Sequence, residues 1–213
     1  NAGEPQFYAL CGRGARSALR VMRHGLAVEE YASSELPAGP VAVWTLRPSL
    51  EAEYDELIVL SFTNATIVLK ISDAVEEVKD SGFVDTSPTF AAGLMQDGAM
   101  MQVNKEGLRH IGAQGKTTQF EVNRTVGEEV VCAALNARQI AYATSSGALA
   151  QSISYFELDE GGANPFKLVT SIPDLGKGIV AVEIGELPRG RLRFPFLAIA
   201  TDKNTVQLHS LEE

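Results

Sequence analysis

Residues 55–83 read DELIVLSFTNATIVLKISDAVEEVKDSGF, and this stretch decides the fold. Two apolar runs, residues 57–62 and 65–71, lie on either side of a Thr63-Asn64 pair. Such runs around a two-residue turn predict a tight β-hairpin of nearly buried strands. Asn is favoured in such turns because it tolerates a positive φ. An acidic segment follows and ends at Phe83, so the stretch predicts a buried hairpin with a more polar outer strand.

The same plan recurs downstream with different residues. Short runs rich in Val, Ile, Leu and Ala alternate with turns that contain Gly, Asn, Asp or Pro, and helical periodicity is almost absent. Successive units begin about 40 to 50 residues apart, which is the spacing of four-stranded propeller blades. The runs span residues 41–46 with 57–71; 90–94, 99–103 and 108–111; 130–135, 140–144 and 149–158; and 179–184, 196–200 and 205–211. We therefore predict an all-β, WD40-like β-propeller, present here as a partial set of four-stranded antiparallel blades.

The start of the chain indicates a piece of a larger propeller. Residues 7–11 and 18–23 have the pattern of the closing half of another blade, followed by a run at 26–31. Four blades and a fraction would leave sheet edges bare, a hazard that proteins avoid. The chain also begins with Asn1 instead of Met, in a segment with the composition of a cut linker. We expect residues 1–213 to be a fragment of a single β-propeller from a longer chain.

The charge balance argues against direct binding of nucleic acid. The chain has 27 acidic and 18 basic residues, for a formal net charge of −9. A phosphate-binding protein needs clustered Lys and Arg, so we expect any RNA contact to be indirect or weak. One basic segment is the exception, and we predict that it forms a contact patch for an acidic partner surface. Its arginines are Arg13, Arg16, Arg20 and Arg23.

The titratable residues give no pattern of a metal or cofactor site. His24, His110 and His209 are far apart in the sequence, and none has a second metal ligand close by. We expect solvent-facing histidines, with no metal and no cofactor. Cys11 and Cys132 occur in apolar, strand-like runs and are expected to be buried free thiols. No apolar stretch approaches the roughly 20 residues that cross a bilayer, so no membrane contact is expected.

Catalytic patterns are missing as well. The sequence has no Gly-x-Ser-x-Gly elbow, and the Glu doublets at 29–30, 76–77 and 128–129 are best explained as solvated strands and turns. Gly12-Arg13-Gly14 has the composition of a phosphate-binding loop, but no helix pattern follows it. We interpret it as a turn between two strands. The sequence predicts a protein that is not an enzyme, and its residues alone indicate an interaction scaffold.

The order of residues along the chain indicates a protein family, which the chemistry of single residues does not. From residue 7 to residue 211 it resembles, in consistent order, the middle propeller of the splicing factor 3b subunit 3 family. The resemblance is looser over residues 112–124. The segments that carry it include CGRG at 11–14, LRVMRHGL at 19–26, SFTNAT at 61–66, VEEV at 75–78, DSGF at 80–83 and GLRHI at 107–111.

That resemblance implies a place in a superfamily of triple-propeller scaffolds. The superfamily also contains damaged-DNA-binding protein 1 and the large subunit of the cleavage and polyadenylation specificity factor. For this chain the resemblance implies the second, seven-bladed propeller of three. It also implies a nuclear protein of the splicing factor 3b complex in the U2 small nuclear ribonucleoprotein, which acts in pre-mRNA splicing and branch-site recognition.

The resemblance also implies partners, which the flanking propellers mainly contact. They are a HEAT-repeat subunit, a small helical subunit and a PHD-like zinc subunit of splicing factor 3b. Two alternatives stay open. One is an adaptor of a cullin ubiquitin ligase of the damaged-DNA-binding protein 1 type, and the other is a subunit of a histone-acetylating coactivator complex.

Overall fold

The computed structural model of this chain describes residues 6–23, 33, 35–112, 115–122, 127–146, 151–159, 164–173, 175, 178–185 and 196–211. The chain divides into two compact units, Asn1–Pro37 and Ala38–Glu213, and each is described by itself. Within the described residues the one helical element is a single 3-10 turn, η1 (Gly14–Arg16), and the other elements are strands. The prediction of an all-β chain is confirmed.

The first unit contains one antiparallel hairpin. Strand β1 (Gln6–Cys11) pairs with β2 (Ala18–Arg23) over its whole length, from Gln6 opposite Arg23 to Cys11 opposite Ala18. The two strands match the runs that the sequence predicted at 7–11 and 18–23. The third run expected there, at residues 26–31, lies outside the described residues.

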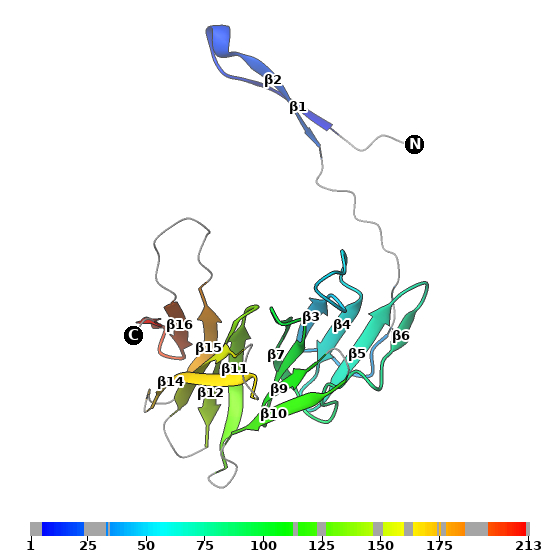
Figure 1. Cartoon of the computed structure of the whole chain (residues 1–213). Coiled ribbons are helices and arrows are strands. Elements are labelled where there is room, and N and C mark those ends of the chain that lie inside the picture. Colours follow the sequence, from blue (N-terminus) through cyan, green and yellow to red (C-terminus); the bar gives the residue numbers. More distant parts are fainter. Residues whose placement is uncertain are drawn as a thin grey trace. The chain divides into compact units, whose positions relative to one another are not determined.

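The second unit consists of consecutive antiparallel sheets, which we number as blades (Figure 1). In each blade, neighbouring strands in the sequence are neighbours in the sheet. The first blade has β3 (Ala42–Leu46), β4 (Leu57–Ser61), β5 (Thr66–Ile71) and β6 (Val75–Glu77); the second has β7 (Thr89–Leu94), β8 (Met100–Asn104), β9 (Gly107–Ile111) and β10 (Thr117–Glu121); the third has β11 (Glu129–Leu135), β12 (Gln139–Ser145), β13 (Ser152–Leu158) and β14 (Phe166–Ile172); the fourth has β15 (Ile179–Ile184), β16 (Phe196–Thr201) and β17 (Val206–Ser210).

The first strands of successive blades contact one another, β3 with β7, β7 with β11 and β11 with β15. That contact pattern is the propeller arrangement, in which the innermost strands stand side by side and the blades stack face to face. The prediction of four-stranded antiparallel blades is confirmed, and in the fourth blade three strands are described.

Each junction between blades has its own apolar core. Leu46, Val59 and Phe83 belong to the cluster between the first and second blades. The cluster between the second and third blades is the richest in large side chains, and includes Met101 and Phe156. The third and fourth blades meet mainly through aliphatic residues, with Tyr155 as the large aromatic side chain among them. Face-to-face burial of these apolar strands is what holds the blades together.

The inner strands of the second, third and fourth blades begin with the same backbone irregularity. Each of β7, β11 and β15 has a register shift at its start, typical of a β-bulge. The first or second residue of each strand donates its N–H to the preceding blade. Thr89 donates to Ser61 Oγ, Val130 to the carbonyl of Lys105 and Ile179 to Gln151 Oε1. This recurrence supports the repeat that the sequence predicted.

The opening stretch forms the predicted hairpin. Val59, Leu60 and Phe62 are buried, and the N–H of Phe62 donates to the carbonyl of Ala65 at 2.8 Å across the Thr63-Asn64 turn. Asn64 does not adopt the positive φ that Asn tolerates, since among the described non-glycine residues only Asn204 has one, at 58°. The turn at 63–64 is therefore built without a left-handed residue.

Candidate interaction site

The predicted basic patch lies on the hairpin of the first unit. Its tip is closed by two backbone hydrogen bonds, from the N–H of Arg16 to the carbonyl of Arg13 at 3.3 Å and from Ser17 to Gly14 at 3.0 Å. Gly14 has a φ of +59°, which an L side chain rarely adopts. The interpretation of this segment as a turn between strands is confirmed. The single 3-10 turn that follows is too short to offer the amides of a helix N-terminus.

Three of the four predicted arginines are exposed. Arg13 and Arg16 lie at the tip, and Arg20 lies on β2 opposite Ala9. None of the ion pairs between described residues involves these three side chains. Arg23 ends β2 opposite Gln6, and its side chain lies outside the described part. The structure therefore brings Arg13 and Arg16 together at one turn and sets Arg20 further along the strand.

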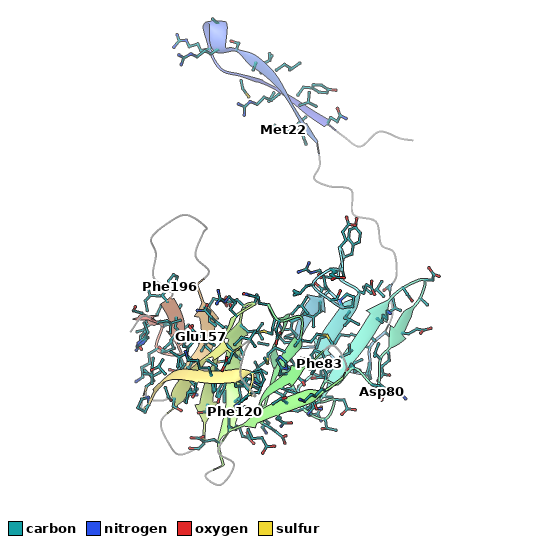
Figure 2. The ribbon with its side chains drawn as sticks, viewed as in Figure 1. Met22, Asp80, Phe83, Phe120, Glu157 and Phe196 are labelled. Carbon is teal, nitrogen blue, oxygen red and sulfur yellow. The ribbon has the colours of Figure 1, made fainter. Side chains whose placement is uncertain are left out.

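Both faces of the hairpin carry exposed apolar side chains. Phe7 lies opposite Met22 on one face, and Leu10 lies opposite Leu19 on the other (Figure 2). Leu10 is 88% exposed and Phe7 is 68% exposed. An isolated two-stranded hairpin is marginal in water, so these apolar faces agree with the prediction that the hairpin is the closing half of a further blade. The predicted contact patch is therefore the cationic tip.

His110 does not face solvent as expected. Its Nε2 lies 2.6 Å from Asp97 Oδ2, and its ring packs edge-on against Phe166 of the third blade at a centroid distance of 6.3 Å. The side chain is only 14% exposed. His209 is half-buried and lies 3.3 Å from Gln207 Oε1, while His24 lies outside the described residues. His110 thus helps to join two blades, a role that no local sequence pattern signals.

The cysteines are less buried than predicted. Cys11 and Cys132 are free thiols, and both are half-buried. Burial raises the pKa of the Cys132 thiol to about 11, and a hydrogen bond with the backbone of Ala143 offsets part of that effect. The thiolate is the reactive form, so Cys132 stays protonated and unreactive at neutral pH.

Two tyrosines of the third blade are also held neutral. Burial raises the pKa of Tyr142 to about 12. Burial likewise raises the pKa of Tyr155 to about 12, with the carboxylate of Glu157 adding to the effect. Tyr155 accepts a hydrogen bond from Gln139 Nε2 at 2.5 Å and donates one to Glu157 Oε1 at 3.2 Å. These groups are polar parts of a packed interior and resemble no acid–base pair.

The carboxylate doublets are mostly on exposed strands and turns, as predicted. Glu76 and Glu77 are exposed on β6, and Glu129 forms an ion pair with Lys105 at 3.0 Å. Glu128 is half-buried, and the doublet at 29–30 lies outside the described residues. In the described part of the chain, no group of three or more His, Cys, Asp or Glu residues could hold a metal ion. No described helix is long and apolar enough to span a membrane.

A buried polar chain, which sequence reasoning missed, fastens the first blade to the second. Gln102 Nε2 donates to Thr89 Oγ1 at 2.8 Å, and the Thr89 and Thr66 hydroxyls lie 2.8 Å apart. Thr66 Oγ1 donates to the carbonyl of Ser87 at 2.7 Å, so Thr89 must be the donor to Thr66. Gln102 also bonds both backbone groups of Val84. The only sequence signal was a polar residue inside an apolar strand.

Comparison with known proteins finds the same family along nearly the whole chain. Residues 28–213 match the family model described as the RSE1/DDB1/CPSF1 second beta-propeller. The chain is 42% identical over 213 residues to splicing factor 3B subunit 3 of Danio rerio, covering 100% of this chain and 17% of that protein.

Relatives from a plant and a fungus agree. Spliceosome-associated protein 130 A of Arabidopsis thaliana is 42% identical over 209 residues, which cover 98% of this chain and 16% of that protein. Pre-mRNA-splicing factor rse1 of Neurospora crassa is 40% identical over 208 residues, which cover 98% of this chain and 16% of that protein. The chain thus spans 16% to 17% of the length of these relatives.

Proposed function

The chain belongs to the RSE1/DDB1/CPSF1 second β-propeller family, and on that premise we propose that it is a non-enzymatic interaction scaffold in pre-mRNA splicing. The assembly proposed is the splicing factor 3b complex of the U2 small nuclear ribonucleoprotein, which recognises the branch site. The observation that carries the proposal is 42% identity, over all 213 residues, to a protein named splicing factor 3B subunit 3.

The domain boundaries are part of the proposal. We take residues 1–213 as a fragment of one seven-bladed propeller, the middle one of three in a longer nuclear protein. A scaffold of this kind binds through surfaces, so its partners are proteins: a HEAT-repeat subunit, a small helical subunit and a PHD-like zinc subunit. Contact with RNA is indirect or weak, because the chain has 27 acidic against 18 basic residues and a net charge of −9.

The physical basis of the scaffold lies in the stacked blades and the hairpin. Apolar cores at the junctions make a stiff frame, and a stiff frame loses little conformational entropy when it binds. The hairpin adds the exposed guanidinium groups of Arg13 and Arg16. Such cations speed the encounter with an acidic partner more than they raise affinity.

Purification of the full-length protein with an affinity tag from nuclear extract tests the proposal. We expect the three splicing factor 3b subunits and the U2 RNA to co-purify, identified by mass spectrometry and by hybridisation. Nuclease treatment should remove the RNA and leave the protein subunits bound. Recovery of a cullin or of a histone acetyltransferase, without the three subunits, would replace the splicing assignment with one of the two alternatives.

A further inference from the structure

Tyr54, at 72%, is the most exposed of the tyrosines that the structure describes, and it lies in the connection between β3 and β4 (Figure 1). Tyr8 of the hairpin is 67% exposed, whereas Tyr142 and Tyr155 are 2% and 1% exposed. Tyr31 lies outside the described residues. Tyr54 therefore offers its phenol to solvent from a loop, while Tyr8 lies within a paired strand.

Among the described residues, the one partner of the Tyr54 hydroxyl is the carboxylate of the preceding residue. Tyr54 Oη donates to Glu53 Oε1 at 2.9 Å. Both side chains are exposed, so water can replace this bond with little change in free energy. The hydroxyl is therefore available to an enzyme that modifies it.

The backbone around this tyrosine is held at its two ends and not in the middle. On one side, the N–H of Ala52 donates to the carbonyl of Ser49 at 3.3 Å. On the other side, the N–H of Glu56 donates to the carbonyl of Leu46 at 3.1 Å. Residues 53–55 make no backbone–backbone hydrogen bond with another described residue. This segment can therefore become extended in the active site of an enzyme while the strands of the blade stay paired.

Carboxylates flank Tyr54 on both sides. Glu51 and Glu53 precede it and Asp55 follows it, and all three are exposed. Asp55 Oδ2 accepts a hydrogen bond from Thr45 Oγ1 at 2.6 Å, which is the side-chain bond that an extended loop would release. Protein kinases use patterns of charge beside the acceptor residue to select their substrates. The flanks of Tyr54 fit a kinase with a basic substrate groove.

We propose that Tyr54 is a phosphorylation site for a protein tyrosine kinase that selects acidic flanks. The phenol oxygen forms a bond to the γ-phosphorus of a magnesium-bound nucleoside triphosphate, and the bond from that phosphorus to the β–γ bridging oxygen breaks. The nucleoside diphosphate leaves, and the phenol proton passes to the catalytic aspartate of the kinase. The product carries a charge of about −2 at pH 7 and three acceptor oxygens, which suit an arginine-bearing pocket of a partner. The site does not depend on which assembly the protein joins.

Phosphorylation of the purified full-length protein tests the inference. The reagents are magnesium ATP and the catalytic domain of a protein tyrosine kinase that prefers acidic peptides, and mass spectrometry gives the initial rate at each tyrosine. We expect the rate at Tyr54 to be at least roughly tenfold higher than at Tyr8, which has no acidic residue within three positions. Tyr54→Phe should remove this phosphopeptide and leave the other sites unchanged.

Neutral side chains of the same shape separate the effect of charge from that of exposure. Glu51→Gln, Glu53→Gln and Asp55→Asn together keep the hydrogen-bond acceptors of the loop and remove its flanking charge. The rate at Tyr54 should fall roughly tenfold. A matched variant, which should leave that rate unchanged, removes the same net charge by changing to Gln three exposed glutamates of outer strands: Glu76, Glu77 and Glu121.

The protein recovered from cells gives the second measurement. Cells that express the full-length protein are treated with vanadate, which inhibits tyrosine phosphatases. We expect a phosphopeptide that contains Tyr54, and its loss after treatment of the sample with a purified tyrosine phosphatase. Equal rates at Tyr54 and Tyr8, equal effects of the two charge variants, or no phosphate on Tyr54 in cells would each overturn the inference.

Discussion

The hairpin and the third blade are built from the same kind of strand pair but differ in what covers them. In the hairpin, Phe7 and Leu10 are 68% and 88% exposed, although every residue of β1 has a partner on β2. In the third blade, Ile140 and Phe156 are 0% and 1% exposed. The comparison shows that backbone pairing alone buries little apolar surface. Burial comes from a second sheet packed on the face.

Removal of an aromatic side chain from the junction between the second and third blades should have the largest effect on stability. Phe156 stacks on Tyr142 at a centroid distance of 5.6 Å and meets the edge of Phe120 at 5.0 Å. Phe156→Ala should lower the free energy of local unfolding by about 3 to 5 kcal/mol, because it leaves a cavity among large side chains. Hydrogen exchange of β12 and β13 in the full-length protein measures the effect.

The hairpin supplies the control for that prediction. Leu10→Ala removes a side chain that is already exposed, so it should change hydrogen exchange of β1 and β2 by less than about 0.5 kcal/mol. If Leu10→Ala costs as much as Phe156→Ala, the hairpin is covered in the full-length protein as firmly as the blades are. That result would remove the contrast between the two regions.

Substitution of two glycines by alanine should have the next largest effect on stability. Gly107 begins β9 with a φ of +140°, and a Cβ there would overlap the carbonyl oxygen of Phe120 on β10. Gly14 of the hairpin has a φ of +59°, and a Cβ there would meet open space. Gly107→Ala should cost about 3 kcal/mol, and Gly14→Ala about 1 kcal/mol from backbone strain alone. Limited proteolysis of the full-length variants, followed over time, compares the two; equal cleavage rates would contradict the overlap at Gly107.

A substitution in the buried polar chain should have a smaller effect on stability. Gln102 is fully buried and bonds Val84 and Thr89 through three hydrogen bonds. Gln102→Met keeps the volume but leaves those partners unsatisfied, so it should cost about 2 kcal/mol. Hydrogen exchange at residues 84–89 measures the loss.

The hairpin again offers the comparison for a polar change. Tyr8 donates a hydrogen bond to Gln6 Oε1 at 3.1 Å on an exposed surface, where water can replace the partner. Tyr8→Phe should therefore leave exchange of β1 unchanged within about 0.5 kcal/mol. A cost at Gln102 as small as the cost at Tyr8 would mean that water reaches the junction between the first and second blades.

The inner strands could be predicted from sequence, whereas the outer strands of the second and third blades were not predicted. Strands such as β8 and β12 are buried on both faces, so their nearly continuous apolar runs mark them. Strand β10, with sequence TTQFE, and β14, with sequence FKLVTSI, face solvent over part of their surface, and neither has the continuous apolar run of a buried strand. The missing signal is physical, because an outer strand is held mainly by its backbone bonds.

The candidate site was predictable only as far as charge in the sequence allows. Clustering of Arg13, Arg16 and Arg20 predicted a basic segment, and the turn at Gly14 explains why the first two come together. The exposed faces of the hairpin were not predicted, since the apolar runs at 7–11 and 18–23 have the pattern of a buried blade. Contacts between distant residues, such as His110 with Asp97, depend on pairing that no local pattern contains.

The smallest effect on stability, and the most informative about function, concerns the arginines of the hairpin. Arg13→Glu, Arg16→Glu and Arg20→Glu together should change the stability of the full-length protein by less than about 0.5 kcal/mol, because the side chains are exposed and none is paired with a described carboxylate. If the patch binds an acidic partner, the same change should slow association and reduce its dependence on salt. A matched control reverses three exposed lysines of the blades, Lys116, Lys167 and Lys203, and produces the same net charge. Recovery of splicing factor 3b subunits from nuclear extract at two salt concentrations separates the two variants. Weaker recovery with the arginine variant alone would assign partner binding to the hairpin. Equal recovery with both would show that net charge matters and that the position of these arginines does not.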